Sequence, residues 1–261
     1  MHELLYFPVT ALGEPIRLCL AIGKLPFKDT TTRTDEKFHE RKKELSPLGD
    51  AGQVPILVLP DGKKALCQSK AILRYLGKVV EYGGAPLYPT DPIAAYEADA
   101  LVDLCDDMRS PVAATFSIAD QAEKEAARAA LWADGGKQRK WAAALDALLA
   151  KDPMTTLTIG NVYAFCIVNM FRTPTFLDGV PPGIFDAFPN IQKHHEWISH
   201  LPPVLAYYEK KDDRKTFMPL AAHPDSSWVS VPAGARFLGA PEDAPPVGEE
   251  PAPKKAKTEE A

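Results

Sequence analysis

The sequence QVPILVLPDGKKALCQSKAILRYLG at residues 53–77 predicts, in order, a strand, a turn, a second strand and a helix. Residues 56–59 form an apolar run of strand length, residues 60–62 are turn formers, and residues 65–67 suit a short return strand. We expect Ser69 to be the helix N-cap, because its hydroxyl can accept a hydrogen bond from an amide of the first turn. Apolar residues then recur at helical spacing and predict a buried helix face.

Two features of this stretch point beyond folding. Val54-Pro55 stands directly before a strand, and X-Pro bonds are where cis peptides occur. A cis bond there would expose the backbone of Val54 as an edge for a peptide, whereas a trans bond would be an ordinary strand entry. Gln68-Ser69 stands at a helix N-terminus, where amide groups favour a carboxylate, although it could equally be a plain cap. Together the two features predict a small acidic peptide as ligand.

These motifs resemble the thioredoxin-like domain of the cytosolic glutathione transferases. The family pattern is a Val-Pro or Ile-Pro pair followed, at this distance, by Glu/Gln-Ser and an Ala-Ile-x-x-Tyr-Leu helix, which here occupies residues 71–76. The resemblance covers about residues 3–215. It implies glutathione as co-substrate, bound by residues of this stretch: Gln53, Val54, Pro55, Gln68 and Ser69.

Composition is consistent with a globular intracellular protein. The chain has 261 residues, 46% of them hydrophobic, and a formal net charge of −5, which does not favour non-specific nucleic-acid binding. It contains no apolar run long enough to span a membrane, and its N-terminus does not look like a secretory signal. Its four cysteines are far apart in apolar segments, as expected of buried cytosolic thiols. We therefore expect a cytoplasmic location.

The first domain is predicted to follow the order β-α-β, then β-β-α, over residues 1–82. Residues 3–7 suit a strand, a helix begins at Glu14-Pro15 and runs to Ile22, and residues 27–32 suit a second strand. The right-handed crossover rule makes these two strands parallel. The fold expected is an α/β thioredoxin-like domain, joined by a linker at residues 83–92 to an all-helical domain at residues 93–218.

Tyr6 is the candidate catalytic residue, because it ends the first strand, where open α/β sheets carry their sites. The alternative is a tyrosine whose ring simply fills the core. The resemblance matches Tyr6-Phe7 to the transferase classes that use tyrosine, closest to the sigma class with its glutathione-dependent prostaglandin D synthases. It implies that Tyr6 donates a hydrogen bond to the glutathione sulfur, which would lower a thiol pKa that is ordinarily about 8.5.

The chain departs from the family pattern at two places near this residue. The sigma-like form has an arginine where Leu12 stands, and Arg17 lies too far into the helix to be the same residue. The family also places an aromatic residue and, four positions on, a lysine to hold the glycine carboxylate of glutathione. Phe38 and Lys42 have that spacing, but phenylalanine cannot donate a hydrogen bond, and Lys43 is an alternative to Lys42.

Acidic side chains cluster on one face of a predicted helix around residues 96–108. Asp99, Asp103, Asp106 and Asp107 share that face, where their mutual repulsion favours a cation, a ligand ammonium or a basic surface. The alternative is a solvated acidic stripe. By the resemblance, Asp107 reaches across a homodimer interface to the glutathione amine of the other subunit. Asp103, Asp106 and Asp107 could also bind a divalent cation, Mg²⁺ or Ca²⁺, at that interface.

The second domain is predicted to contain an alanine-rich helical region at residues 122–149, interrupted at Gly135-Gly136, and a buried helix at residues 162–171. The family starts that buried helix with Ser/Thr-x-Ala-Asp. Here Gly160 and Asn161 replace the last two residues, so we expect Asn161 to bond back to Thr158. His194-His195 does not have metal spacing and is read as surface or partly packed. Residues 219–261 are rich in Pro, Ala, Lys and Glu and read as an extended, partly disordered tail.

Three functions follow from this reading. The first is a dimeric glutathione transferase that adds glutathione to a small-molecule electrophile or uses it in isomerase or peroxidase chemistry. The second is a non-catalytic scaffold of the same fold, which the missing arginine keeps open. The third is a thiol-disulfide enzyme, which would require a cysteine where Tyr6 stands. The electrophile cannot be read from the sequence.

Overall fold

A four-stranded mixed sheet forms the first domain of the computed structural model, which describes residues 1–7, 9–31, 36–47, 53–172 and 177–212. The strand order is β2-β1-β3-β4, with β1 and β2 parallel and the other neighbours antiparallel. The thioredoxin-like order β-α-β, β-β-α is confirmed, and one further helix precedes β3. The elements are β1 (His2–Tyr6), α1 (Glu14–Ile22), β2 (Phe27–Thr31), α2 (Glu36–Leu45), β3 (Ile56–Val58), β4 (Ala65–Cys67) and α3 (Ser69–Val79).

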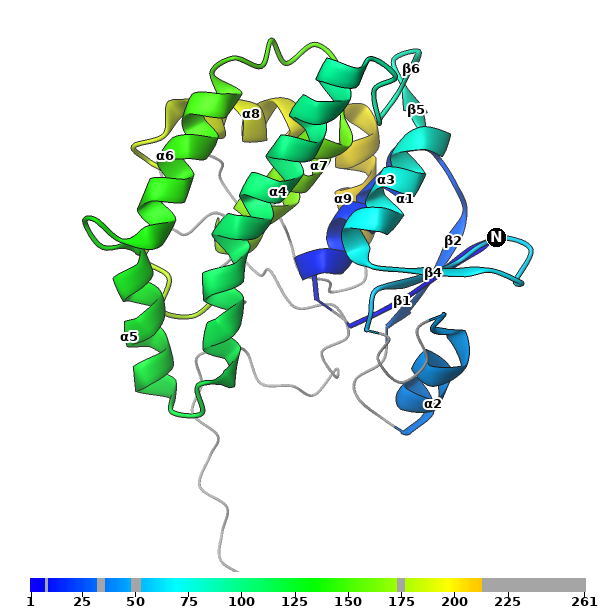
Figure 1. Ribbon diagram of the computed structural model, residues 1–261, viewed down its shortest axis with the longest axis horizontal. Coiled ribbons are helices and arrows are strands. Elements are labelled where there is room, and N and C mark those ends of the chain that lie inside the picture. The colour runs from blue at the N-terminus through cyan, green and yellow to red at the C-terminus, as the bar shows by residue number, and fades with distance from the viewer. Residues whose placement is uncertain (8, 32–35, 48–52, 173–176, 213–261) are drawn as a thin grey trace, which may run out of the picture.

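The central strand β1 carries the core of this domain. Leu4 and Leu5 point to opposite faces of the sheet, as successive strand residues must, and neither is exposed to solvent. On one face Leu4 joins the main hydrophobic core with residues of α1 and α3. On the other face Leu5 and Ile56 pack with Leu45 at the end of α2. Figure 1 shows α2 below the sheet and α1 and α3 between the sheet and the second domain.

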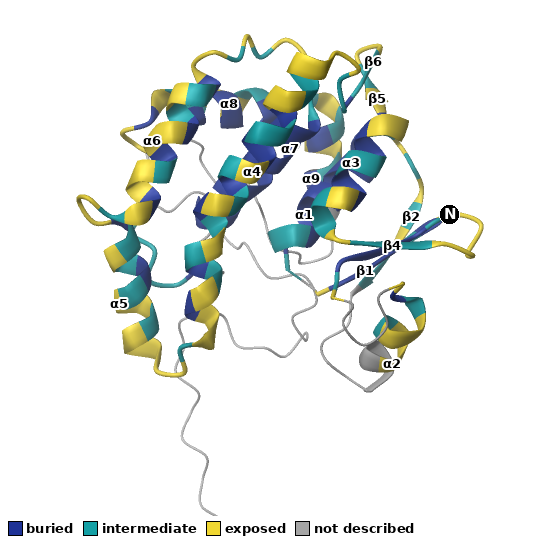
Figure 2. Cartoon of the chain, in the orientation of Figure 1, coloured by how far each residue is buried: buried dark blue, intermediate teal, exposed yellow. Residues whose placement is uncertain are grey.

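The second domain is helical throughout the part that the structure describes. Its long first helix, α4, is capped by Asp91, whose carboxylate accepts hydrogen bonds from the amides of Ile93 and Ala94. Helix α7 runs through the centre and is buried along its whole length (Figure 2). Its helices are α4 (Pro92–Ala114), the short 3₁₀ helix η3 (Thr115–Ser117), α5 (Gln121–Trp132), α6 (Lys137–Leu149), α7 (Ile159–Arg172), α8 (Pro189–Ser199) and α9 (Pro202–Asp212). A second short 3₁₀ helix, η1 (Ala11–Gly13), precedes α1 in the first domain.

The boundaries between the elements agree with most sequence predictions. The break at Gly135-Gly136 separates α5 from α6, and the fully buried helix is the one expected. A small hairpin, β5 (Glu81–Tyr82) and β6 (Ala85–Pro86), crosses the start of the predicted linker, and its turn residues Gly83 and Gly84 both have positive φ. Within the described residues, no helix combines the length and the hydrophobicity needed to cross a bilayer. The tail at 219–261 lies outside the described residues.

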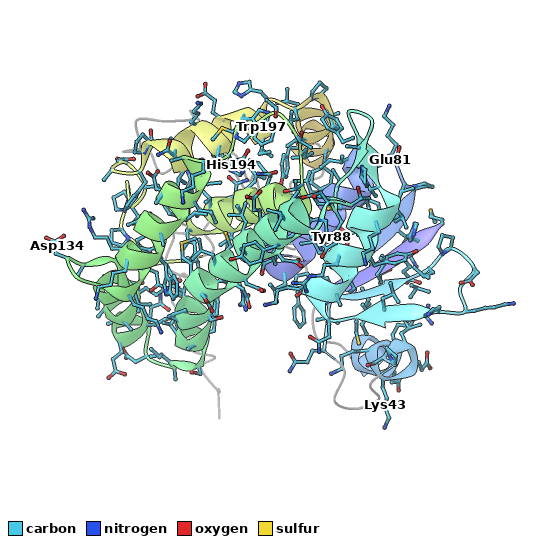
Figure 3. The ribbon with its side chains drawn as sticks, turned by 45° about the horizontal axis from the view of Figure 1, so that its top comes forward. Lys43, Glu81, Tyr88, Asp134, His194 and Trp197 are labelled. Carbon is cyan, nitrogen blue, oxygen red and sulfur yellow. The ribbon has the colours of Figure 1, made fainter. Side chains whose placement is uncertain are left out.

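The prediction that His194 and His195 are at the surface or only partly packed is wrong. Both are buried on α8, with exposures of 1% and 0%, because this helix packs against α6, α7 and α9 and both sides of it are covered. His194 contacts the side chain of Asn161 and the ring of Trp197. Figure 3 shows the His194 and Trp197 side chains on α8. His195 stacks on Phe165. Burial lowers the pKa of His194 to about 4, so it is neutral at pH 7.

The start of α7 is built around Asn161, as predicted. Its side-chain oxygen accepts hydrogen bonds from the backbone N–H and the hydroxyl of Thr158, at 2.9 and 2.8 Å. Its side-chain nitrogen donates to Asp152 Oδ2 at 2.6 Å. Asn161 therefore provides an acceptor for Thr158 at the start of the helix and a donor for the carboxylate of Asp152. An aspartate here, the family residue, would keep the first role and lose the second.

We expect Asn161→Asp to destabilise the protein, although it restores the family pattern. The substitution places a second carboxylate against Asp152 and removes a donor, at a cost of about 1 kcal/mol. The midpoint of thermal unfolding at neutral pH measures the effect. The double variant Asn161→Asp with Asp152→Asn should recover most of the loss, since an amide can again donate between the two residues. Equal stability of the single variant and the wild type would show that the charge at Asp152 is of no importance.

Candidate functional site

The hydroxyl of Tyr6 is oriented by the loop that follows it. Its oxygen accepts a hydrogen bond from the backbone N–H of Leu12 at 3.2 Å. Its ring lies against Gly13, where an added Cβ would come within 2.4 Å of the ring. Tyr6 is 5% exposed. Because the oxygen is already an acceptor, the O–H hydrogen is available to be donated, and no described residue is recorded as accepting it.

The ionisation of Tyr6 follows from its surroundings. Burial raises the pKa of Tyr6, and this effect outweighs the N–H of Leu12 and the positive charges of Arg17 and Arg109, which lower it. The hydroxyl therefore keeps its proton at neutral pH. In this state the side chain acts as a hydrogen-bond donor, and it is poorly suited to act as a base.

The predicted peptide-binding edge and anion site lie at the ends of β3 and α3. The Val54–Pro55 bond is cis. Gln68 has φ = 72°, a left-handed conformation that is uncommon outside glycine and that gathers at functional sites. Because the chain turns at Gln68, α3 begins at Ser69 itself. The prediction that Ser69 is the N-cap is wrong: Gln68 is the N-cap and makes no side-chain capping bond.

The remaining glutathione candidates are placed less completely. Gln53 is exposed, next to half-buried Val54 and buried Pro55. In α2, Lys42 is half-buried, whereas Lys43 is exposed and points away from the sheet (Figure 3). Phe38 lies in α2, and its side chain is outside the described residues.

Of the four aspartates predicted on one face of α4, all but Asp107 pair with basic residues of α3 in the same chain. Lys70 Nζ lies 3.0 Å from Asp103 Oδ1 and 3.3 Å from Asp106 Oδ2. Arg74 Nε lies 2.7 Å from Asp99 Oδ1. The positive charges predicted to balance these aspartates are therefore Lys70 and Arg74 of the first domain. Asp107 is exposed, and no described residue is recorded as its hydrogen-bond or ion-pair partner.

The predicted metal site is not supported within one chain. Among the described residues, no three His, Cys, Asp or Glu side chains are grouped so that they could hold a metal ion. Asp106 is surrounded by donors instead, since besides Lys70 it accepts from Arg109 Nε at 2.9 Å and from the Tyr163 hydroxyl at 3.2 Å. The oxygens of Asp106 are therefore used by protein groups.

We expect acid to weaken the contact between the two domains through Asp106. Burial raises its pKa, but Arg109 and Lys70 act more strongly and hold the pKa below its ordinary value. A depressed pKa in the folded state means that these bonds stabilise the protein above about pH 4 and are lost as pH falls through the folded-state pKa. Asp106→Asn should therefore reduce the free energy of unfolding at pH 7 by about 1 kcal/mol, which lowers the midpoint of thermal unfolding. Below about pH 4 the midpoint of this variant should decrease less steeply with pH than that of the wild type.

Asp134→Asn is the matched control for that experiment. The Asp134 side chain is fully exposed and stands clear of the body (Figure 3). Its substitution should leave the acid dependence of the unfolding midpoint unchanged. If the unfolding midpoints of the wild type and of Asp106→Asn decreased in parallel as the pH is lowered, Asp106 would not be the source of the acid dependence.

Sequence reasoning missed two charged residues near Tyr6. Arg17 is completely buried, and its guanidinium carbon lies 5.6 Å from the centre of the Tyr6 ring. The signal was Glu14, three residues earlier, since an acid and an arginine at this spacing pair on one helix face. Arg109 acts on Tyr6 from α4, and no local pattern connects these two residues in the sequence.

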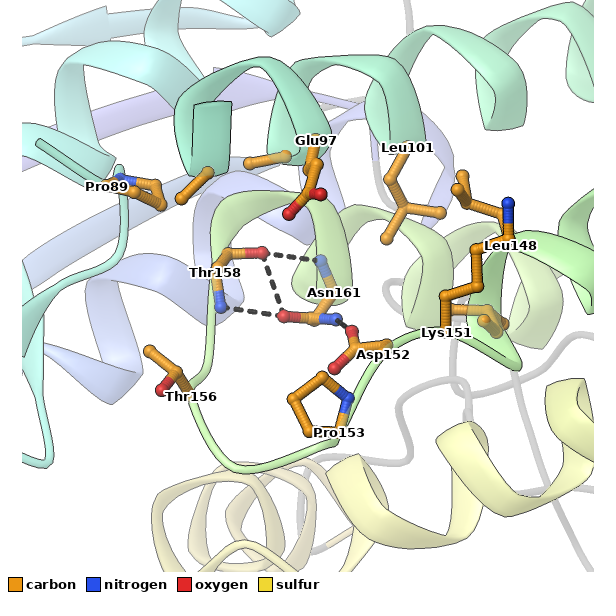
Figure 4. A pocket seen from close by; sticks show the side chains of 13 residues that line it. Pro89, Glu97, Leu101, Leu148, Lys151, Asp152, Pro153, Thr156, Thr158 and Asn161 are labelled. Carbon is orange, nitrogen blue, oxygen red and sulfur yellow. Dashed lines mark hydrogen bonds between the residues drawn. The ribbon is translucent and has the colours of Figure 1, made fainter. Parts of the chain in front are cut away.

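A pocket in the second domain lies apart from all the predicted site residues. Its volume is about 330 Å³. Figure 4 shows it between α4, the end of α6 and the start of α7. Leu101, Leu148 and Pro153 contribute apolar walls, and Glu97 projects into it. Neither Tyr6 nor the α3 N-terminus lines this pocket. It is not the candidate site.

Comparisons with known proteins connect this geometry to one family. The family profile described as glutathione S-transferase, N-terminal domain, matches residues 13–79. A glutathione S-transferase of Anopheles gambiae is 36% identical over 124 residues, which cover 48% of this chain and 55% of that protein. Glutathione S-transferase alpha-4 of Rattus norvegicus is 26% identical over 229 residues, which cover 88% of this chain and 95% of that protein.

Solved structures show the same fold. The prostaglandin synthase D of Nilaparvata lugens superposes with a TM-score of 0.65 at 26% identity, over 81% of this chain and 98% of that one. The sigma class GST of Fasciola hepatica gives a TM-score of 0.63 at 22% identity, over 84% of this chain and 98% of that one. Both domains are therefore arranged as in these proteins.

Proposed function

We propose that this chain, which belongs to the cytosolic glutathione transferase family, binds glutathione in its first domain and activates the thiol through Tyr6 for attack on a small electrophile. The observation that carries the proposal is the hydrogen bond from the Leu12 N–H to the Tyr6 oxygen at 3.2 Å. In this bond the Tyr6 oxygen is the acceptor, which leaves its O–H hydrogen to be donated. That hydrogen is the group that a thiolate would accept.

The chemistry requires the thiolate of glutathione to be stabilised near neutral pH. A free thiol has a pKa of about 8.5, and the thiolate is the nucleophile. A hydrogen bond from Tyr6 to the sulfur favours the charged form and lowers the thiol pKa. Tyr6 is suited to this role because burial keeps its own proton in place. The sulfur then attacks the electrophilic atom, and its former proton leaves to solvent.

Binding of glutathione is assigned to the groups around the sheet edge and the N-terminus of α3. The backbone of Val54, beside Pro55 and exposed Gln53, offers a peptide edge. Gln68 and Ser69 offer the helix N-terminus to a carboxylate, since no described residue is recorded as bonding the Ser69 hydroxyl. Lys42 is the basic residue for the second carboxylate, with Phe38 beside it in α2. Asp107 is exposed, as its role toward a second subunit requires.

A homodimer fits the surface of the two helices that carry these residues. Ile93 and Tyr96 on α4 are 66% and 68% exposed, and Val79 at the end of α3 is 50% exposed. Large apolar side chains with this exposure suit a surface that a partner covers. A second copy of this chain would cover them and bring Asp107 to the partner's site. The proposed location is the cytosol, where glutathione is abundant and the free cysteines stay reduced.

The experiment that tests this function is calorimetric titration with glutathione, followed by a conjugation assay with an activated aryl chloride. The wild type should bind glutathione and form the thioether. Ser69→Ala should raise the KM for glutathione about tenfold with little change in kcat, because it removes one bond to a charged group. Ser117→Ala, on the exposed η3 turn, is the control and should change neither constant. Absence of glutathione binding would leave the non-catalytic scaffold as the function.

A further inference from the structure

The backbone that follows Tyr6 is held by a single buried arginine. Arg17 Nη1 donates to the carbonyl oxygen of Val9 at 2.7 Å, and Nη2 donates to that of Phe7 at 3.2 Å. The two carbonyls belong to the loop between β1 and η1, which places the Leu12 N–H on the Tyr6 oxygen. One guanidinium therefore fixes the chain on both sides of position 8.

The guanidinium is itself fixed by two carboxylates from different elements. Its Nε donates to Asp29 Oδ2 on β2 at 2.8 Å, and Nη1 lies 3.2 Å from Glu14 Oε2 on α1. Glu14 is 1% exposed and Arg17 0%, so the positive charge is buried and compensated where it lies. A planar fork with several donors makes all these bonds at once, which a lysine ammonium cannot do.

The last described helix completes this group. The hydroxyl of Tyr207 on α9 donates to Glu14 Oε1 at 3.2 Å, across 193 positions of sequence. Glu14 thus receives bonds from both domains, and it holds Arg17. The Arg17 guanidinium in turn lies over the ring of Tyr6, 5.6 Å from its centre. A continuous set of contacts runs from α9 to the candidate catalytic tyrosine.

We infer that Arg17 is a positioning residue for Tyr6: its fork on the Phe7 and Val9 carbonyls, anchored by Asp29, Glu14 and Tyr207, holds the Tyr6 hydroxyl where it can donate to the glutathione sulfur. The inference rests on the proposed function. Two carboxylates compensate its charge, and Arg17→Lys would keep that charge, so the role we assign to Arg17 is the geometric one.

The test separates geometry from charge by replacing Arg17 with lysine. Arg17→Lys keeps the positive charge and loses the fork. It should still bind glutathione, because Gln68 and Ser69 are untouched, but the pKa of the bound thiol should rise by about one unit, a roughly tenfold loss of thiolate at a pH below both pKa values. Arg17→Lys combined with Tyr6→Phe should show no rise beyond that of Tyr6→Phe alone, since Arg17 acts through Tyr6.

Other outcomes are equally decisive. An unchanged thiol pKa in Arg17→Lys, or rises that add in the double variant, would overturn the positioning role. If Arg17→Lys does not fold, Tyr207→Phe decides: a smaller rise in the same direction supports the role, and no rise overturns it. Tyr82→Phe, in the β5–β6 hairpin, is the control and should leave the thiol pKa alone. A wild type that binds glutathione without lowering its thiol pKa would overturn the proposed function itself, and this inference with it.

Discussion

Replacement of Tyr6 by phenylalanine is expected to raise the pKa of bound glutathione by about one to two units and to lower kcat/KM by about 10- to 100-fold. The reason is the loss of one hydrogen bond to a charged sulfur, which contributes about 1.5–3 kcal/mol. The ring stays in place, because it packs flat on Gly13 and within the main core. Thiolate absorbance of the bound glutathione, followed against pH, measures the shift directly.

Two accompanying results make the Tyr6→Phe experiment decisive. The affinity for glutathione should change little, because the residues proposed to bind it lie just before β3, at the start of α3, in α2 and in α4. The loss of rate should shrink at high pH, where free thiolate forms without help. If the thiol pKa in the wild type already equals that of free glutathione, then Tyr6 has the structural role that its burial also allows.

Replacement of Gly160 by alanine is expected to destabilise the protein by about 2–3 kcal/mol, although alanine is the family residue and the better helix former. Gly160 lies in the first turn of α7, where it meets α4. An added Cβ would lie 2.7 Å from the carbonyl oxygen and 3.1 Å from the Cα of Ala98. These are backbone atoms, so the two helices must separate. The free energy of unfolding from denaturant titration measures the effect.

The reverse substitution on an open helix face calibrates the helix propensity. Ala126 is exposed in the middle of α5, and Ala126→Gly should cost about 1 kcal/mol from propensity alone. Gly160→Ala should then lower stability in spite of an opposite propensity effect, and Gly160→Ser should lower it more. A Gly160→Ala variant as stable as the wild type, or more so, would show that α4 and α7 separate without cost.

Periodicity and turn chemistry made the first domain predictable. The strand run at 56–59, the turn at 60–62 and the helix after Ser69 are local signals, and each appears within a residue or two of its predicted place. The end of β1 marked Tyr6 in the same way. The alanine-rich helices and their break at Gly135-Gly136 followed from composition alone.

The predictions that failed depended on neighbours distant in sequence. Ser69 seemed an N-cap because a left-handed Gln68 has no sequence signature. The histidines of α8 seemed exposed because a polar pair on a helix usually faces water, and only the packing of α6, α7 and α9 around them decides otherwise. The acidic stripe required a cation, but no pattern said that Lys70 and Arg74 of the other domain would provide it.

The ion pairs between α3 and α4 also limit how chimeric proteins could be made from this chain and a relative. Lys70 follows Ser69 directly, so the helix that we propose binds the glutathione carboxylate is also the helix that pairs with the acids of the second domain. A chimera that joined residues 1–82 to the helical half of a relative would keep its site in place only if that half offered acids where Asp99, Asp103 and Asp106 stand. An exchange of the helical half therefore has to keep this acidic face, together with the Tyr207 hydroxyl that bonds Glu14, if the first domain is to keep its site.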